Sequence, residues 1–181
     1  MGEVITAAQL NGLPVRIADS TLSGDAASIS FSSIPAIYAH LYLECYLRAD
    51  NAATTQNTYF RFNADSGANY DYQNILGSAA TASATEAFGQ TLMFITGIPG
   101  NNAGANLFAG VTIDVPHYAQ TANNKDIIVQ SAGKIGTSTG NLGVSATVGF
   151  WRSNAAVSTI TIGPATGNLK SGSRATLFGM P

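Results

Sequence analysis

Apolar and polar residues alternate strictly along residues 40–48 of this 181-residue chain. Leu41, Leu43, Cys45 and Leu47 fall on one side of an extended chain, and the intervening residues fall on the other. A helix has a period of 3.6 residues and would spread both sets around its axis. The segment is therefore predicted to be a β-strand with one buried face.

The same period of two recurs in residues 59–63, 111–115, 144–151, 160–162 and 174–179. In residues 144–151 the apolar set that starts at Val144 and includes Ala146, Val148 and Phe150 is expected to face inward, which leaves Trp151 on the outer face. Clusters of Gly, Asn, Pro and Ser separate these segments and favour turns. No segment has a convincing amphipathic helical pattern, so the sequence predicts an all-β protein, an antiparallel sandwich or barrel.

The composition indicates a chain that contacts other proteins. Only 10% of its residues are charged, against about 25% in a typical globular domain, while the hydrophobic share is an ordinary 45%. Disordered chains combine low hydrophobicity with high net charge, so disorder is not expected. Charged residues are depleted in the cores of protein interfaces, and we therefore expect much of the surface to face other subunits.

Charge and cysteine content disfavour several functional classes. The eight Lys and Arg residues form no run, so nucleic-acid binding through a basic patch is not expected. Net charge is −2, and no apolar run approaches the roughly 20 residues of a membrane-spanning helix, so no membrane partner is predicted. The first residues, MGEVI, lack the basic and apolar regions of a signal peptide, so none is predicted either. Cys45 is the single cysteine, which excludes an internal disulfide and suits assembly in a reducing compartment.

No residue pattern indicates catalysis. The two histidines, His40 and His117, have no serine in a G-x-S-x-G motif to accompany them, and they are too few for a His-based zinc site. The ten acidic residues show no paired signature for glycoside hydrolysis, although Glu44 and Asp114 lie in predicted strands and could meet in the fold. The sequence thus predicts a protein that is not an enzyme and needs no metal or cofactor.

Oxygen-bearing side chains recur between Asn63 and Asp71 around a central Gly67, as in calcium-binding loops. The closing acidic ligand and the flanking helices of an EF-hand are missing. We therefore favour an ordinary turn in which Asp65 and Asn69 cap their own backbone, with cation binding as the alternative.

Aromatic residues supply candidate contacts with other proteins. Tyr42 and Tyr46 share the polar face of one predicted strand, which suits a flat interface. Contact with another subunit is preferred over stacking on carbohydrate. The aromatic side chains that the pattern leaves outside the core are Tyr38, Tyr42, Tyr46, Tyr59, Tyr70, Tyr72, Tyr118 and Trp151.

The segments GFWRS at residues 149–153, VSTITI at residues 157–162 and SGSRATLFGM at residues 171–180 are similar to segments of tailed-bacteriophage virion proteins. The last of them follows the pattern of serine-glycine-serine, strand and glycine that ends such proteins. Residues 34–41 and 59–67 fit the same group, so the resemblance extends over most of the chain from about residue 28 onward.

This resemblance implies a jelly-roll-like β-sandwich, usually trimeric, on the outside of a phage head or tail. A compact domain without a long fibrous region favours a capsid decoration (cement) protein, with itself and the major capsid protein or other virion proteins as partners. Such a protein resides in the virion and is assembled in the host cytoplasm. The alternative is a tail or fibre module that binds a host receptor or glycan through end loops such as residues 63–72 and 101–106.

The predicted division of the chain is an N-terminal arm, residues 1–13, followed by the β-sandwich domain, residues 14–181. The apolar side chains of the arm are hard to explain in a free tail, so the arm is expected to bind the capsid or a neighbouring subunit. The residues predicted to make capsid or subunit contacts are Val4, Ile5, Leu10, Leu13, Tyr42, Tyr46 and Trp151.

Overall fold

The computed structural model describes residues 12–137 and 141–181, and all of its regular elements are strands. The strands are β1 (Val15–Thr21), β2 (Ile29–Phe31), β3 (His40–Leu47), β4 (Thr55–Phe62), β5 (Tyr70–Ser78), β6 (Thr81–Gln90), β7 (Met93–Pro99), β8 (Ala109–Pro116), β9 (Lys125–Lys134), β10 (Leu142–Trp151), β11 (Ile160–Pro164) and β12 (Arg174–Met180).

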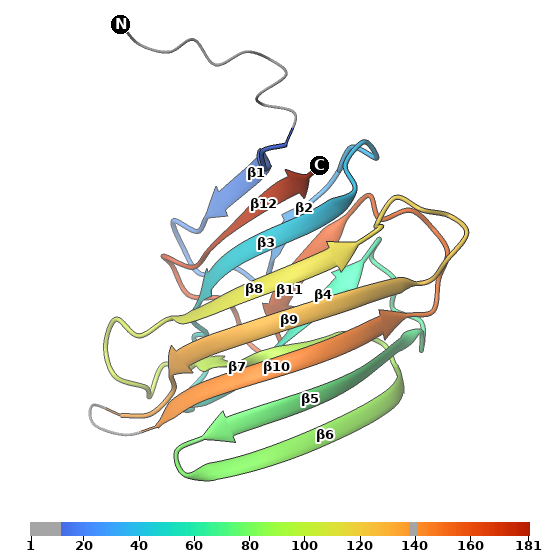
Figure 1. Cartoon of the computed structure of the whole chain (residues 1–181). Coiled ribbons are helices and arrows are strands. Elements are labelled where there is room, and N and C mark those ends of the chain that lie inside the picture. The colour runs from blue at the N-terminus through green and yellow to red at the C-terminus, as the bar shows by residue number, and fades with distance from the viewer. Residues whose placement is uncertain (1–11, 138–140) are drawn as a thin grey trace, which may run out of the picture.

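The strands form two antiparallel sheets that pack face to face. The larger sheet has eight strands in the order β1-β12-β3-β8-β9-β10-β5-β6, and the smaller has four in the order β2-β11-β4-β7. Figure 1 shows the larger sheet in front, with the strands of the smaller sheet behind it. The predicted all-β antiparallel sandwich is confirmed.

The order of the strands follows a nested pairing. In the larger sheet β12 lies between β1 and β3, and β3 pairs with β8; in the smaller sheet β11 lies between β2 and β4, and β4 pairs with β7. Two hairpins, β5–β6 and β9–β10, extend the larger sheet beyond β8. Strands β9, β10 and β5 pack on β7 of the smaller sheet, β6 forms the edge of the larger sheet, and together they provide a broad outer surface (Figure 1).

The core lies between the two sheets and uses alternate residues of each strand. Every second residue of β3 and β8 is buried, including Cys45, and so is every second residue of β4 from Thr58 onward, as the alternation predicts. Side chains of this core from both sheets include Leu41, Leu43, Leu47, Phe60, Phe62, Ile95, Val111, Ile113, Val115, Ile160, Ile162 and Leu177.

Strand β10 has the opposite orientation to the predicted one. Ser145 and Thr147 point into the sandwich and are buried, whereas Val144 is 61% exposed and Val148 is 55% exposed. The interior is too narrow here for large side chains, because a Cβ added at Gly149 would lie 2.1 Å from Sδ of Met93 on the facing sheet. Small hydroxyl residues and glycine therefore occupy the inward positions.

Hydroxyl groups satisfy one another inside this part of the sandwich. The Oγ atoms of Ser131 and Ser145 are 2.7 Å apart, and they lie 2.7 and 3.0 Å from Oγ1 of Thr96 on the facing sheet. Thr147 donates to the carbonyl of Ile95 at 2.9 Å and accepts from Nδ2 of Asn74 at 2.7 Å. Because buried polar groups are costly unless they are hydrogen-bonded, this network is what allows β10 to turn its polar side inward.

Candidate functional site

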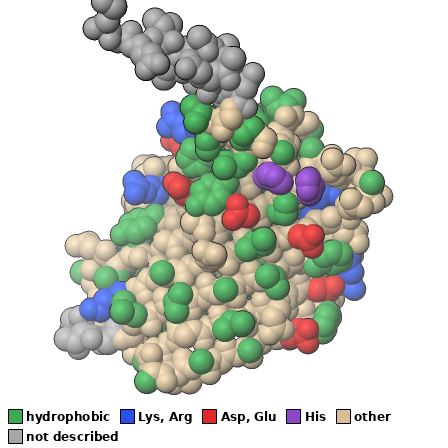
Figure 2. Space-filling model, in the orientation of Figure 1, with side chains coloured by type: hydrophobic (Ala, Val, Ile, Leu, Met, Phe, Trp, Pro, Cys, Tyr) green, Lys and Arg blue, Asp and Glu red, His purple; other side chains and the backbone are tan. Residues whose placement is uncertain are grey.

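The outward side of β5, β9 and β10 carries an exposed apolar surface, which we call the open face. Its members are Ile75, Ile128, Val144, Ala146 and Val148. Figure 2 views the molecule from this side and shows separate hydrophobic side chains over these strands, among uncharged side chains and backbone. Because these exposed apolar side chains share one side of the sheet, the open face is the candidate contact site for another molecule.

A shallow hollow of about 530 Å³ lies within the open face. Gly77, Val144, Ala132 and Gly110 follow one another across four neighbouring strands in a single row of outward positions. Because Gly77 and Gly110 have no side chains, the surface is lower along this row. Ile75, on the next row, lines the hollow beside it. The lining contains no charged residue, so a partner could bury it without desolvating a charge.

Tyr42 and Tyr46 both lie on the outward side of β3, as the sequence predicts. The ring of Tyr46 stacks on Phe108 at a centroid distance of 4.8 Å, and the Arg174 guanidinium lies 5.5 Å from its centre. Tyr42 packs beside Phe178 at 6.3 Å. These contacts hold both rings in place on the sheet, and their role in subunit contact stays a prediction.

Acidic side chains surround Tyr42 at the β3–β8 part of the same sheet. Burial, followed by the charges of Glu44 and Asp114, raises the pKa of the Tyr42 phenol. Burial also raises the pKa of Asp114, although the nearby His40 acts in the opposite direction. Glu44 and Asp114 thus lie on neighbouring strands and both act on Tyr42, with Asp114 directly opposite Tyr42 in the register. The ring of His40 lies 5.1 Å from that of His117.

The predicted contact role of Trp151 is wrong, because its side chain is only 2% exposed. The ring packs against Phe62 at 5.2 Å and stacks on Tyr70 at 6.4 Å, and its Nε1 donates to Oδ2 of Asp65 at 2.7 Å. The reversal of β10 causes this burial, since Trp151 lies on the same side as Ser145 and Thr147. Tyr70 and Tyr118 are also buried, although the alternation left them outside the core.

The segment between Asn63 and Asp71 forms a turn that its own side chains stabilise. Oδ1 of Asp65 accepts from the Gly67 N–H at 2.8 Å, and Oδ2 accepts from Asn69 at 2.9 Å as well as from Trp151. The predicted capping by Asp65 is confirmed, whereas Asn69 bonds to the Asp65 carboxylate. Both oxygens of Asp65 therefore already have donors.

Of the residues predicted to make contacts through the N-terminal arm, the structure describes one. Leu13 is described and exposed, while Val4, Ile5 and Leu10 lie outside the described residues. Within residues 12–137 and 141–181, no group of three or more His, Cys, Asp or Glu side chains is arranged to hold a metal ion. The same part of the chain has no helix long and apolar enough to cross a membrane.

The sequence reasoning missed the open face. Alternation shows that β10 has two sides but does not say which one is buried when the second side carries only Ser, Thr, Gly and Trp. One available signal was the size of that second set, because small residues and a lone Trp fit a narrow interior better than a solvated surface. The second signal was the presence of glycines at positions 77 and 110, within β5 and β8.

Comparison of the chain with protein-family models, curated protein sequences and solved structures gave no match.

Proposed function

We propose that this chain is a structural virion protein, a trimeric capsid decoration protein that stabilises a phage head. The observation that carries the proposal is the open face on the outer side of the larger sheet. A strand that turns Val144 and Val148 to solvent and buries Ser145 and Thr147 reverses the usual arrangement of a half-buried sheet. Such a reversal is expected where a partner covers the outer side.

The occupant that we assign to the open face is a second copy of this chain. The same face presents both protruding β-branched side chains and a hollow whose lining includes Gly77, Gly110 and Ala132, so two copies can supply each other with complementary shapes. Neither side carries a charge that would lose its water in the contact. Each half-exposed Val or Ile that becomes buried contributes about 1 kcal/mol to association.

The strand pairing supports the jelly-roll part of the proposal. A jelly roll is a nested arrangement in which the first and last strands pair, and successive strands alternate between two four-stranded sheets except for the middle two, which pair in one sheet. The sets β1-β12-β3-β8 and β2-β11-β4-β7 follow that order. In this reading the hairpins β5–β6 and β9–β10 are additions to one sheet, and they carry most of the open face.

In the proposed mechanism the protein reinforces the assembled shell by binding to it. A protein that binds the assembled shell, and not its free subunits, stabilises the assembled state by mass action. Three weak contacts made by one trimer act together because the second and third form at a high effective concentration. The N-terminal arm and the Tyr42–Tyr46 side of β3 are the proposed contacts with the capsid.

Quantitative mass spectrometry of intact particles tests this function. Hundreds of copies in each particle support decoration, a handful of copies at the tail supports the alternative tail or fibre module, and absence from particles contradicts both. A Val144→Ser/Val148→Ser variant should occupy particles at least about tenfold less than wild type, which corresponds to about 1.4 kcal/mol. Ile37→Ser is the matched control, because Ile37 is exposed but lies away from the open face, and its occupancy should not change.

A further inference from the structure

A bulge in β6 directs one aromatic side chain outward at the end of the larger sheet. The register between β5 and β6 shifts between Tyr70 and Tyr72, where β6 contains an extra residue. Gly89 adopts a φ of +61° at this point, a conformation that glycine accepts readily. Next to it, Phe88 is 65% exposed. Bulges of this kind commonly re-aim a side chain beside a binding site.

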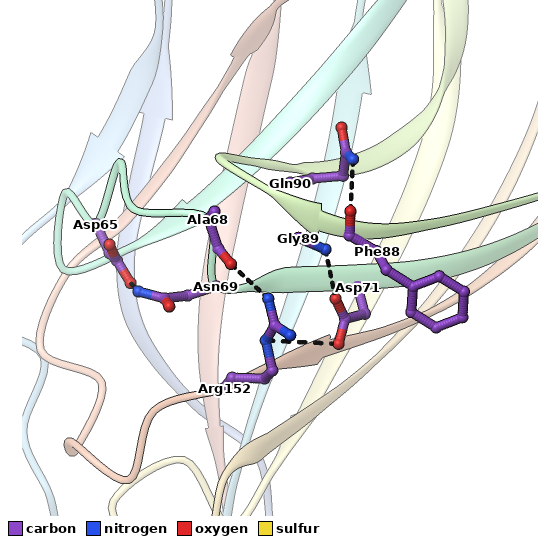
Figure 3. Close-up of polar contacts among 8 residues, drawn as sticks. All are labelled: Asp65, Ala68, Asn69, Asp71, Phe88, Gly89, Gln90 and Arg152. Atoms are coloured by element: carbon purple, nitrogen blue, oxygen red, sulfur yellow. Dashed lines mark hydrogen bonds and ion pairs between the residues drawn. The ribbon is translucent and has the colours of Figure 1, made fainter.

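The bulge is held by a carboxylate that also holds an arginine. Oδ1 of Asp71 accepts from the Gly89 N–H at 2.7 Å, and Oδ2 lies 3.6 Å from Nε of Arg152. Arg152 also donates to the carbonyl of Ala68. Figure 3 shows Arg152 between Ala68 and Asp71, with Phe88 extending away from them. The guanidinium is therefore positioned in advance, while 44% of the side chain remains exposed.

Two neighbouring hollows meet beside these residues. The first, of about 660 Å³, is lined by two loop segments that include Asn123, Asn124, Arg152 and Asn154. The second, of about 260 Å³, runs along Phe88 and the ends of β5 and β10. The two share Phe150 and Asp126, so together they form one groove, which we call the end groove.

Several polar side chains of the end groove have no partner within the protein. In the described part of the chain, the side chains of Asp126, Asn124, Asn154 and Glu86 make no hydrogen bond or ion pair. Each lines one of the two hollows. Carboxylate and amide groups thus face the groove with their full hydrogen-bonding capacity, next to the exposed rings of Phe88 and Phe150.

From this arrangement we infer that the end groove binds a neutral glycan. A pyranose ring has apolar C–H faces that pack on aromatic rings, and hydroxyl groups that pair with carboxylates, amides and guanidinium. The groove supplies both kinds of group within one concave site. A phosphorylated or sulfated ligand fits less well, because the single arginine is already paired with Asp71, and Asp126 and Glu86 would repel an anion.

This inference goes beyond the proposed decoration role and does not depend on it. The groove uses Phe88, Phe150 and the loops around residues 122–124 and 152–154, whereas the contact between copies is centred on Ile75 and Val144; of the residues that define the open face, Val148 alone also lines the groove. A decoration protein that also binds glycan would attach the particle to sugar-bearing surfaces. Trimer formation can fail while glycan binding persists, and the reverse also holds.

The test is isothermal titration of the full chain with neutral oligosaccharides of glucose, galactose, mannose and N-acetylglucosamine, each to millimolar concentration. The inference predicts saturable binding of at least one of them. Phe150→Ala should weaken that binding about tenfold, the upper range for one aromatic contact, and Asp126→Ala should weaken it at least as much. Val144→Ala and Gln130→Ala are the matched controls on the same strands and the same side, and their affinities should equal that of wild type.

Absence of binding by all four classes of oligosaccharide would overturn the inference, and so would binding that Phe150→Ala and Asp126→Ala leave unchanged. Should Phe150→Ala fail to fold, Asn154→Ala provides a second variant in an exposed loop, with the same expected direction. Light scattering on the same samples gives the mass of the assembly, which separates failure of the glycan site from failure of the trimer.

Discussion

The indole Nε1 of Trp151 donates a 2.7 Å hydrogen bond to Oδ2 of Asp65, which connects the last residue of β10 to the turn between β4 and β5. The same carboxylate accepts from Asn69 and from the Gly67 N–H. This bond joins the added hairpin β9–β10 to the turn that leads into β5. It also explains why the ring of Trp151 is buried at a position where a surface residue was expected.

Trp151→Phe should lower the free energy of unfolding by about 2 kcal/mol, since hydrogen bonds to charged groups contribute about 1.5–3 kcal/mol. Urea denaturation followed by circular dichroism measures this change. The matched variant Tyr59→Phe changes an aromatic side chain of the smaller sheet and should change stability by less than about 0.5 kcal/mol. Equal effects of the two variants would contradict a special role for the Trp151–Asp65 bond.

The same bond predicts a dependence of stability on pH. Burial alone would raise the pKa of Asp65, but hydrogen bonds from Trp151, Asn69 and Gly67 outweigh it and hold the pKa below its ordinary value of 3.8. A carboxyl with a lowered pKa in the folded state contributes stability above its unfolded pKa and loses it as the pH falls through the folded pKa. Urea midpoints measured from pH 6 down to pH 2 should therefore fall less steeply in Asp65→Asn than in wild type.

Substitutions on the two sides of β10 should differ in how much they lower the free energy of unfolding. Val144→Ser changes a side chain that is exposed in a single chain, so at a concentration where the copies are dissociated it should leave the free energy of unfolding within about 0.5 kcal/mol. Ser145→Val places a larger apolar group beside Ser131 and Thr96, breaks two hydroxyl contacts, and should cost about 2–3 kcal/mol. Thermal and urea unfolding of the two variants measures the difference, and a larger loss in Val144→Ser than in Ser145→Val would contradict the orientation of the strand.

Arg48 should stabilise the segment between β7 and β8. Its buried guanidinium donates to the carbonyls of Gly104, Leu107 and Ala103 at 2.9–3.3 Å. Arg48→Met keeps the aliphatic stem but leaves these carbonyls without a donor, and should cost about 3 kcal/mol. Amide hydrogen exchange should also become faster in residues 100–108. Arg16→Met is the control, because Arg16 is exposed and its pairing with Asp19 contributes little.

Cys45 should be unreactive in the folded protein. The thiol is buried on the inner side of β3, and burial, with a smaller contribution from Glu44, raises its pKa to about 12. The thiolate is the reactive species, so iodoacetamide at pH 8 should label Cys45 only in urea. Rapid labelling of the native protein would show that this part of the sandwich opens to solvent.

The fold class could be predicted from the sequence because most strands follow a simple rule, in which β-branched and other large apolar residues take the inward positions. β3, β4 and β8 obey it. β10 does not, because its inward side depends on how close Met93 and Thr96 of the facing sheet approach. That distance is a tertiary property, and no spacing within residues 142–151 encodes it.

The sequence alone could place candidate site residues together only where they lie on a single strand. Tyr42 and Tyr46 could be placed on one side of β3 from their spacing alone. The open face and the end groove combine strands and loops that are far apart in the chain, such as Gly77 with Gly110 and Phe88 with Asn154. Their assembly depends on the order in which the hairpins join the larger sheet.

The mass of the native protein in solution tests the central claim most directly, measured by light scattering for wild type and for Val144→Ser/Val148→Ser. We predict a wild-type mass of about three times the 18.6 kDa of one chain, and a shift of the variant toward a folded single chain with an unchanged circular dichroism spectrum. A wild-type monomer, or a variant that keeps the full wild-type mass, would contradict the assignment of the open face as the contact between copies.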